Sequence, residues 1–268
     1  MNLSISDNGV VCLKLDPNMP SDYYGSKLCF QNYTSENQAN KKIFISEGNC
    51  LHYDSAQDVY TVPHDINISQ RCFLLRLIID AEELKRGNLP LHAAAICDGA
   101  RVFIMAALPG NGKSFLAHEI CRQISDCEII GDDHIILTPT HIQGNIRRRM
   151  RNRDSKTIGY ATNKGFCKMY PVTWICIAKQ ETDCEPIFLS GADAFNALTA
   201  ASAFKYLNET FTHNEIRYST SVITDLKIDE TYWKRFNAFL KESRMLFLRG
   251  TLNYVGDIIL ALIRDNHE

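Results

Sequence analysis

The stretch RVFIMAALPGNGKSFLAHEICRQI at residues 101–124 decides which fold this chain can adopt. Residues 102–105 are a continuous apolar run, which is typical of a strand buried on both faces. Apolar residues then recur at helical spacing from Phe115 to Ile124, so residues 107–114 form a loop between a strand and a helix. A phosphate-binding loop requires this setting, and the stretch therefore predicts an α/β fold.

The loop carries the residue types that bind nucleotide phosphates. Its glycines let backbone N–H groups point at phosphate oxygens, and the helix N-terminus adds positive potential. Lys113 supplies a cation for the outer phosphates, and the Ser114 hydroxyl suits magnesium. Ala107 replaces the first glycine of the GxxxxGK[ST] pattern, and alanine serves there if the position needs no positive φ. The residues expected to contact the nucleotide are Pro109, Gly110, Asn111, Gly112, Lys113, Ser114 and Phe115.

A second apolar run, CEIIGDDHIIL at residues 127–137, contains two adjacent aspartates, Asp132 and Asp133. We expect them at the carboxyl end of a strand neighbouring the loop strand, where ligands bind in open α/β sheets. One carboxylate there can orient magnesium, and the other can take the proton of an attacking hydroxyl. Neighbours on an extended chain point in opposite directions. We therefore predict Asp132 as the base and Asp133 as a magnesium ligand with Ser114, although the reverse assignment would also serve a kinase. The alternative is an acidic turn without function.

The stretch LPLHAAAICDGARVFIMAALPGNGKSFLAHEICRQISDCEIIGDDHIIL at residues 89–137 resembles the HPr kinase/phosphorylase group. It looks most like the smaller HPr-kinase-like kinases of lasso-peptide and related biosynthetic clusters. The features that carry this resemblance are the Leu-His-Ala upstream of the strand, the phosphate loop, and the Asp-Asp pair one helix later. Residues 170–204 fit more loosely the strand–acidic turn–strand–helix pattern that ends such kinases.

The resemblance implies a P-loop HPr-kinase/phosphoenolpyruvate-carboxykinase-like α/β core with a mixed sheet. It also implies that His92 lies near the phosphate site and helps to position metal or phosphate. The alternative is that His92 has only a structural role, with its ring hydrogen-bonded between two strands.

The chain departs from the family in the segment IRRRMRNRDSKTIG at residues 146–159. This segment stands in place of the Arg-Gly-Leu-Gly type signature of the phosphorylase reaction, which favours a kinase-only relative and argues against HPr as the substrate. The arginines Arg147, Arg148 and Arg149 could clamp the transferred phosphoryl group or an acidic substrate. Otherwise the run is a solvated loop.

The chain divides into two portions. Residues 1–66 combine Asn, Ser, Asp, Tyr and Gly with short alternating stretches, which predicts a small, mostly β N-terminal portion. Residues 67–268 would form the kinase core. Apolar spacing in this core predicts a helix over 69–86 that ends at Gly87.

Three further elements follow from the pattern of the core. Helical spacing predicts helices over residues 192–207 and over much of 246–263. The Asp98–Gly99 pair predicts a tight hairpin turn between two strands.

Composition sets bounds on function. The 268 residues are 45% hydrophobic and carry a net charge of −2, so bulk charge indicates neither a nucleic-acid nor a membrane partner. No signal peptide or membrane-length apolar run is expected. The ten cysteines form no CxxC, which favours reduced, mostly buried thiols in a cytoplasmic protein over a disulfide framework. Formation of a homo-oligomer stays open.

The sequence thus predicts a kinase that uses ATP, or another nucleoside triphosphate, with Mg²⁺. It would transfer the γ-phosphoryl group to a hydroxyl of a peptide, a protein serine or a small-molecule alcohol. The residues expected to carry catalysis are His92, Lys113, Asp132 and Asp133. The alternative is a nucleotide-binding regulatory module, in which Ala107 marks lost catalysis and the arginine run binds a partner.

Overall fold

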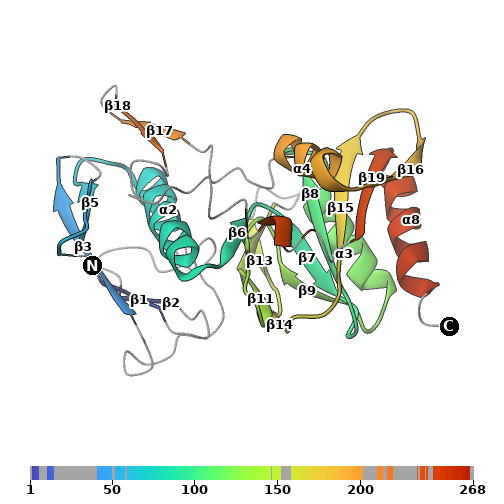
Figure 1. Cartoon of the computed structure of the whole chain (residues 1–268), viewed down its shortest axis with the longest axis horizontal. Helices are drawn as coiled ribbons and strands as arrows, with labels where there is room; N and C mark the ends of the chain where they lie inside the picture. Colours follow the sequence, from blue (N-terminus) through green and yellow to red (C-terminus); the bar gives the residue numbers. More distant parts are fainter. Residues whose placement is uncertain are drawn as a thin grey trace.

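The structure is a computed structural model. It describes residues 2–5, 11–14, 41–49, 52–57, 59–145, 147–151, 158–201, 210–213, 216–219, 234, 236–238, 240 and 244–265. These residues form an α/β arrangement in which the N-terminal strands and the C-terminal helix lie at opposite ends (Figure 1).

A mixed six-stranded sheet forms the centre of the fold, with the strand order β16-β19-β15-β8-β7-β9. Its strands are β7 (Ala94–Cys97), β8 (Val102–Ala107), β9 (Glu128–Gly131), β15 (Val172–Lys179), β16 (Cys184–Leu189) and β19 (Arg244–Gly250). Strand β15 runs parallel to both β8 and β19, whereas β7 runs antiparallel to β8 and β9. Every residue of β8 is buried, as the apolar run predicted. The mixed α/β sheet expected from the sequence is therefore confirmed.

Helices cover both faces of this sheet. Helices α3 (Lys113–Gln123) and α8 (Leu252–Arg264) share one apolar cluster with the sheet residues Phe103 and Ile175. Helix α4 (Gly191–Ala200) contributes to the cluster on the other face, around Trp174. Both faces of the central strands are thereby buried, as parallel strands require.

A second, four-stranded sheet packs beside the first, with the order β14-β11-β10-β6. Its strands are β6 (Leu89–Leu91), β10 (Ile135–Leu137), β11 (His141–Gly144) and β14 (Phe166–Lys168). Leu91, Ile135 and Ile142 join the same apolar cluster as Trp174. The second sheet therefore shares its core with the first.

Two largely apolar stretches of the sequence each divide between these two sheets, at the polar residues that they contain. The run before the hairpin divides into β6 and β7, and His92 lies in the break. The run at 127–137 divides into β9 and β10, with Asp132 and Asp133 in the break. The expectation that β9 directly neighbours the loop strand is wrong, because β7 lies between β9 and β8.

The hairpin between β7 and β8 is longer than the sequence suggested. The register pairs Cys97 with Val102, so four residues connect the strands instead of a two-residue Asp98–Gly99 turn. The Asp98 carboxylate accepts hydrogen bonds from the N–H groups of Ala100 and Arg101, at 3.0 and 2.7 Å. These bonds stabilise the wider turn.

The N-terminal portion contains a five-stranded sheet of order β2-β1-β3-β5-β4. Its strands are β1 (Asn2–Ile5), β2 (Val11–Lys14), β3 (Lys41–Gly48), β4 (His52–Asp54) and β5 (Val59–Pro63). Helix α2 (Ile68–Arg86) follows, with a capping box of Asn67 and Gln70 and with Gly87 as its left-handed C-cap. The predicted helix and its end at Gly87 are confirmed. The Tyr60 hydroxyl donates a 2.6 Å hydrogen bond to Glu82, which joins this sheet to α2.

Two helix predictions need correction at their bounds. Residues 246–250 belong to strand β19, and α8 begins only at Leu252. A short apolar run does not distinguish a buried strand from a helix by spacing alone, and here pairing with β15 decides. Helix α4 covers the first part of the range 192–207, and residues 202–209 lie outside the described residues.

The structure also describes two hairpins and part of the thiols. The hairpins are β12 (Arg147–Arg151) with β13 (Ile158–Thr162), and β17 (Thr210–His213) with β18 (Ile216–Ser219). The cysteines whose side chains are described are all free, and four of them are buried: Cys97, Cys127, Cys167 and Cys176. In the described part of the chain, no helix has both the length and the hydrophobicity needed to cross a bilayer.

Candidate functional site

The predicted phosphate loop, residues 107–114, lies between β8 and α3 as expected. Gly110 and Gly112 both adopt φ of +84°, a backbone conformation that suits glycine. Asn111 anchors the loop to the sheet, because its side-chain oxygen accepts a 3.1 Å hydrogen bond from the N–H of Lys179 at the end of β15. Leu108, Pro109 and Phe115 are exposed. The loop thus presents its glycines at the carboxyl edge of the sheet.

Ala107 fits the loop without strain. It is the last residue of β8, it is fully buried, and it pairs with Ile177 of β15. Asp133 is the only non-glycine residue with a positive φ in the described part of the chain, so Ala107 has no such requirement. The replacement of the first glycine therefore imposes no conformational penalty.

Lys113, His92 and Asp133 form one cluster behind the loop. Lys113 Nζ lies 3.1 Å from His92 Nε2 and 3.9 Å from Asp133 Oδ1. His92 Nε2 lies 2.7 Å from the same Asp133 oxygen. Lys113 and His92 are buried, whereas the Asp133 side chain is 62% exposed. The structure therefore brings together three side chains that are 41 residues apart in sequence at their widest.

Asp132 faces a different partner. The Ser114 hydroxyl donates a hydrogen bond to Asp132 Oδ1, and the Asp132 N–H donates one of 2.7 Å to Asn145 Oδ1. The chain turns sharply here, because β9 ends at Gly131 and Asp133 adopts φ of +76°. The expectation that Ser114 and Asp133 bind magnesium together stays a prediction, but Ser114 lies against Asp132, and Asp133 lies against His92. These contacts favour the reverse assignment of the two aspartates.

The two carboxylates have opposite electrostatic environments. Burial raises the pKa of Asp132 to about 6, with a smaller upward contribution from Asp133, against the hydrogen bond from Ser114. Loss of hydration also acts on Asp133, but the hydrogen bond and charge of His92, with Lys113 and Arg76, hold its pKa below the usual range. Asp133 is therefore the carboxylate that is both charged and accessible at neutral pH.

This difference predicts a pH-dependent stability. A raised pKa gives a stability contribution that is complete below the unfolded value of 3.8 and is lost as the pH rises through about 6. We expect Asp132→Asn, without metal or nucleotide, to raise the free energy of unfolding by about 3 kcal/mol at pH 8 and to leave it nearly unchanged at about pH 3. Urea unfolding at the two pH values measures this.

The matched variant Asp133→Asn should behave in the opposite way. Its lowered pKa contributes stability that is present above the unfolded value and is lost as the pH falls, so this variant should be less stable than the parent at pH 8. An Asp132→Asn variant that is less stable than the parent at pH 8 would contradict the assignment of Asp132 as the buried, desolvated carboxylate.

Helix α2 supports the aspartate turn through residues that the sequence did not single out. The fully buried Asp80 carboxylate accepts a 2.8 Å hydrogen bond from Nε2 of His134, the residue after Asp133. Arg76 of the same helix contributes positive charge at Asp133. The sequence signal for Asp80 is its position directly after the apolar residues 77–79 of this helix, although nothing local indicates its partner His134.

The arginine run forms a strand over its described part. Residues Arg147 to Arg151 pair with residues 158–162 in antiparallel register, so the run is an ordered hairpin strand instead of a loop. Arg153 lies outside the described residues. Strand β12 begins two residues after Asn145, which holds the Asp132 backbone. The hairpin of β12 and β13 therefore begins close to the turn that carries Asp132 and Asp133.

The residues beside the loop suit a magnesium–nucleotide complex. No group of three or more His, Cys, Asp or Glu side chains within the described residues could hold a metal. Magnesium bound with a nucleotide does not need three protein ligands, because phosphate oxygens and water complete its coordination beside one or two protein oxygens. The Ser114 hydroxyl and the buried Asp132 carboxylate provide two such oxygens in direct contact. The oxygens of Ser114 and Asp132 therefore fit a magnesium ion that is bound together with a nucleotide.

No family model matches this chain, and a search of curated proteins finds no match. The resemblance to the HPr kinase/phosphorylase group stays a prediction.

Proposed function

We propose that this chain is a P-loop kinase with an HPr-kinase-like core, which transfers the γ-phosphoryl group of ATP to a hydroxyl acceptor. The observation that carries the proposal is the convergence of Lys113, Ser114, Asp132, Asp133 and His92 at one edge of the sheet. A glycine-rich loop alone would support nucleotide binding. An accessible carboxylate beside the loop lysine also supports transfer.

The loop and its lysine would hold the phosphates. Backbone N–H groups of Gly110 to Ser114 point at phosphate oxygens in such loops, at the N-terminus of α3. Lys113 would direct its ammonium group to the outer phosphates. Magnesium, when bound beside Ser114 and Asp132, neutralises charge on the phosphate oxygens.

Asp133 would accept the proton of the acceptor. Its carboxylate is the accessible one of the pair, and geometry takes precedence in the choice of a general base. The acceptor oxygen forms a bond to the γ-phosphorus, the bond from that phosphorus to the leaving ADP oxygen breaks, and the hydroxyl proton passes to Asp133.

His92 would link the charge states of Lys113 and Asp133, because its Nε2 can hydrogen-bond to either side chain. Its Nε2 lies within hydrogen-bonding distance of both Lys113 and Asp133, and it can donate to the carboxylate only when it carries the proton. In that form His92 orients Asp133, and Lys113 can turn toward phosphate. In the other tautomer, Nε2 accepts from Lys113 and the lysine is held back.

A screen with γ-labelled ATP tests the proposal. Pools of hydroxyl-bearing peptides and small alcohols are incubated with the protein, ATP and Mg²⁺, and acceptors that gain the label are isolated. We expect labelled product that disappears when the metal is chelated. Nucleotide binding without any labelled product would favour a regulatory module.

The arginine strand should affect the acceptor. Replacement of Arg147, Arg148 and Arg149 by Ser should raise the acceptor KM at least about tenfold, because charged hydrogen bonds are lost, and should reduce its salt dependence. Arg264→Ser, at the exposed end of α8, is the matched control. A fall in kcat instead would indicate that the arginines clamp the phosphoryl group. If neither parameter changes, the strand plays no part in the reaction.

A further inference from the structure

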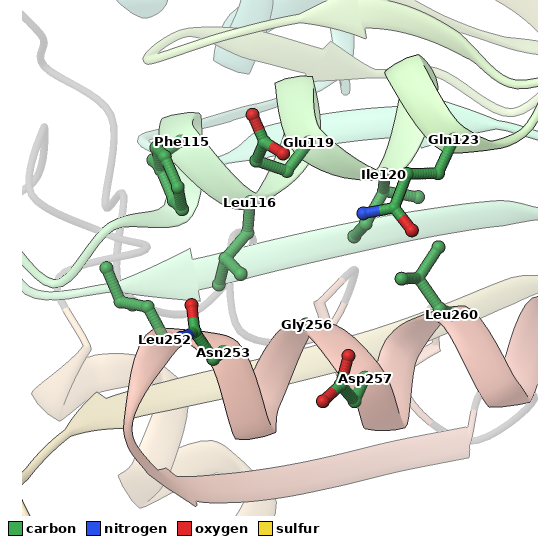
Figure 2. Close-up of a pocket in the computed structure, with 10 residues that line it drawn as sticks. All are labelled: Phe115, Leu116, Glu119, Ile120, Gln123, Leu252, Asn253, Gly256, Asp257 and Leu260. Carbon is green, nitrogen blue, oxygen red and sulfur yellow. The ribbon is translucent and has the colours of Figure 1, made fainter.

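A groove between α3 and α8 begins where the phosphate loop ends. It encloses about 130 Å³, and Phe115 and Leu252 form the end nearest the loop (Figure 2). Phe115 directly follows the loop serine, and 47% of its surface is exposed. Leu252 packs against the loop so closely that a side chain at Gly112 would lie 2.6 Å from Leu252 Cδ2. The groove is therefore continuous with the phosphate loop.

The position of the aspartates fixes the direction of a bound nucleotide. Strands β9, β8, β15 and β19 point the same way, and β8 with its loop lies between β9 and β19. Asp132 and Asp133 follow β9, so the γ-phosphate lies on that side. The nucleoside must then extend toward the other side, where β19 leads into α8.

The groove has walls that suit a base and a ribose. Figure 2 shows Asn253 and Asp257 of α8 along one wall and Glu119 and Gln123 of α3 along the other. Asn253, Asp257 and Gln123 make no side-chain hydrogen bond with any described residue, and all three are exposed. Amide and carboxylate groups of this kind pair with base edges and ribose hydroxyls.

The length of the groove agrees with one nucleoside. The groove follows α3 from Phe115 to Gln123, which is about 12 Å at the rise of an α-helix. Gly256 lets the two helices approach, since a methyl group there would lie 3.3 Å from Leu116 Cδ2. At about 130 Å³ the open groove is smaller than a pocket for a complete drug-sized ligand, so a bound base and ribose would be only partly enclosed.

We infer that this groove binds the base and ribose of the nucleoside triphosphate, with the base against the ring of Phe115. The inference rests on the proposed binding of nucleotide phosphates at the loop, and it adds the subsite that distinguishes a nucleotide from inorganic polyphosphate.

Titration calorimetry with two probes in the presence of Mg²⁺ tests the inference. ATP occupies loop and groove, whereas inorganic tripolyphosphate occupies only the loop. Phe115→Ala should weaken ATP binding about tenfold, as loss of one base-stacking ring does, and leave tripolyphosphate binding unchanged. Phe115→Trp should retain the ATP affinity. Phe188→Ala, which removes an exposed ring of β16 that does not line the groove, is the matched control.

The outcomes distinguish failure of the nucleoside groove from failure of phosphate binding at the loop. Unchanged ATP affinity in Phe115→Ala would overturn the groove assignment, and so would an equal loss for ATP and tripolyphosphate. Failure of the parent protein to bind either probe would overturn the proposed function together with the groove. Binding of tripolyphosphate as tight as that of ATP would retain the phosphate loop and overturn the groove alone.

Discussion

Lys113→Ala should reduce phosphoryl transfer at least about 100-fold, which is the scale of the loss of one strong electrostatic donor at a developing charge. Lys113 is 6% exposed, and its ammonium group lies 3.9 Å from Asp133, the proposed general base. The measurement is steady-state transfer of label from γ-labelled ATP.

Two further variants make this result interpretable. Lys113→Met keeps most of the aliphatic stem in the buried position, so it separates loss of charge from loss of packing. Lys168→Ala removes an exposed lysine of β14 and should retain the parent rate. Parent-like turnover in a folded Lys113→Ala protein would exclude the kinase mechanism proposed above.

The two aspartate variants should have different kinetic signatures. Asp133→Asn should lower kcat by about 10²- to 10⁴-fold while ATP binding stays nearly intact, because a proton acceptor acts in the transition state. Asparagine tolerates the left-handed backbone at this position, so the φ of +76° adds little strain to the variant. Rapid-quench kinetics and equilibrium binding of ATP measure the two quantities separately.

Asp132→Asn should weaken magnesium-dependent ATP binding at least about tenfold, since even outer partners of a bound metal cost that much. Its hydrogen bond with Ser114 places it on the phosphate side of the pair. If Asp132→Asn lost only kcat and Asp133→Asn lost metal-dependent binding, the order predicted from sequence would be restored. If both variants turned over at the parent rate, the pair would be an acidic turn.

The sequence predicted the parts of the site that depend on local pattern. A buried strand, a glycine-rich loop and an amphipathic helix follow one another, so the loop and Lys113 could be placed from neighbours alone. The suitability of Ala107 needed the structure, because the strand expected from the sequence covers residues 102–105 whereas strand β8 extends to residue 107.

The parts that depend on long-range pairing could not be predicted. Polar residues mark both breaks, His92 in one and Asp132 to His134 in the other, but only pairing with two different sheets makes each stretch into two strands. The apolar spacing at 246–250 also fits a helix, and only pairing with β15 makes these residues a strand. The contact between Asp80 and His134 joins residues 54 apart, and no local pattern indicates it.

The most direct test of the central claim measures binding and turnover in the same sample. ATP binding is titrated with and without Mg²⁺, and ADP formation is followed in the presence of an acceptor pool. We predict that magnesium strengthens ATP binding and that ADP forms in equal amount to phosphorylated acceptor. Tight magnesium-dependent ATP binding with neither ADP nor phosphorylated acceptor would contradict the kinase and leave a nucleotide-binding module.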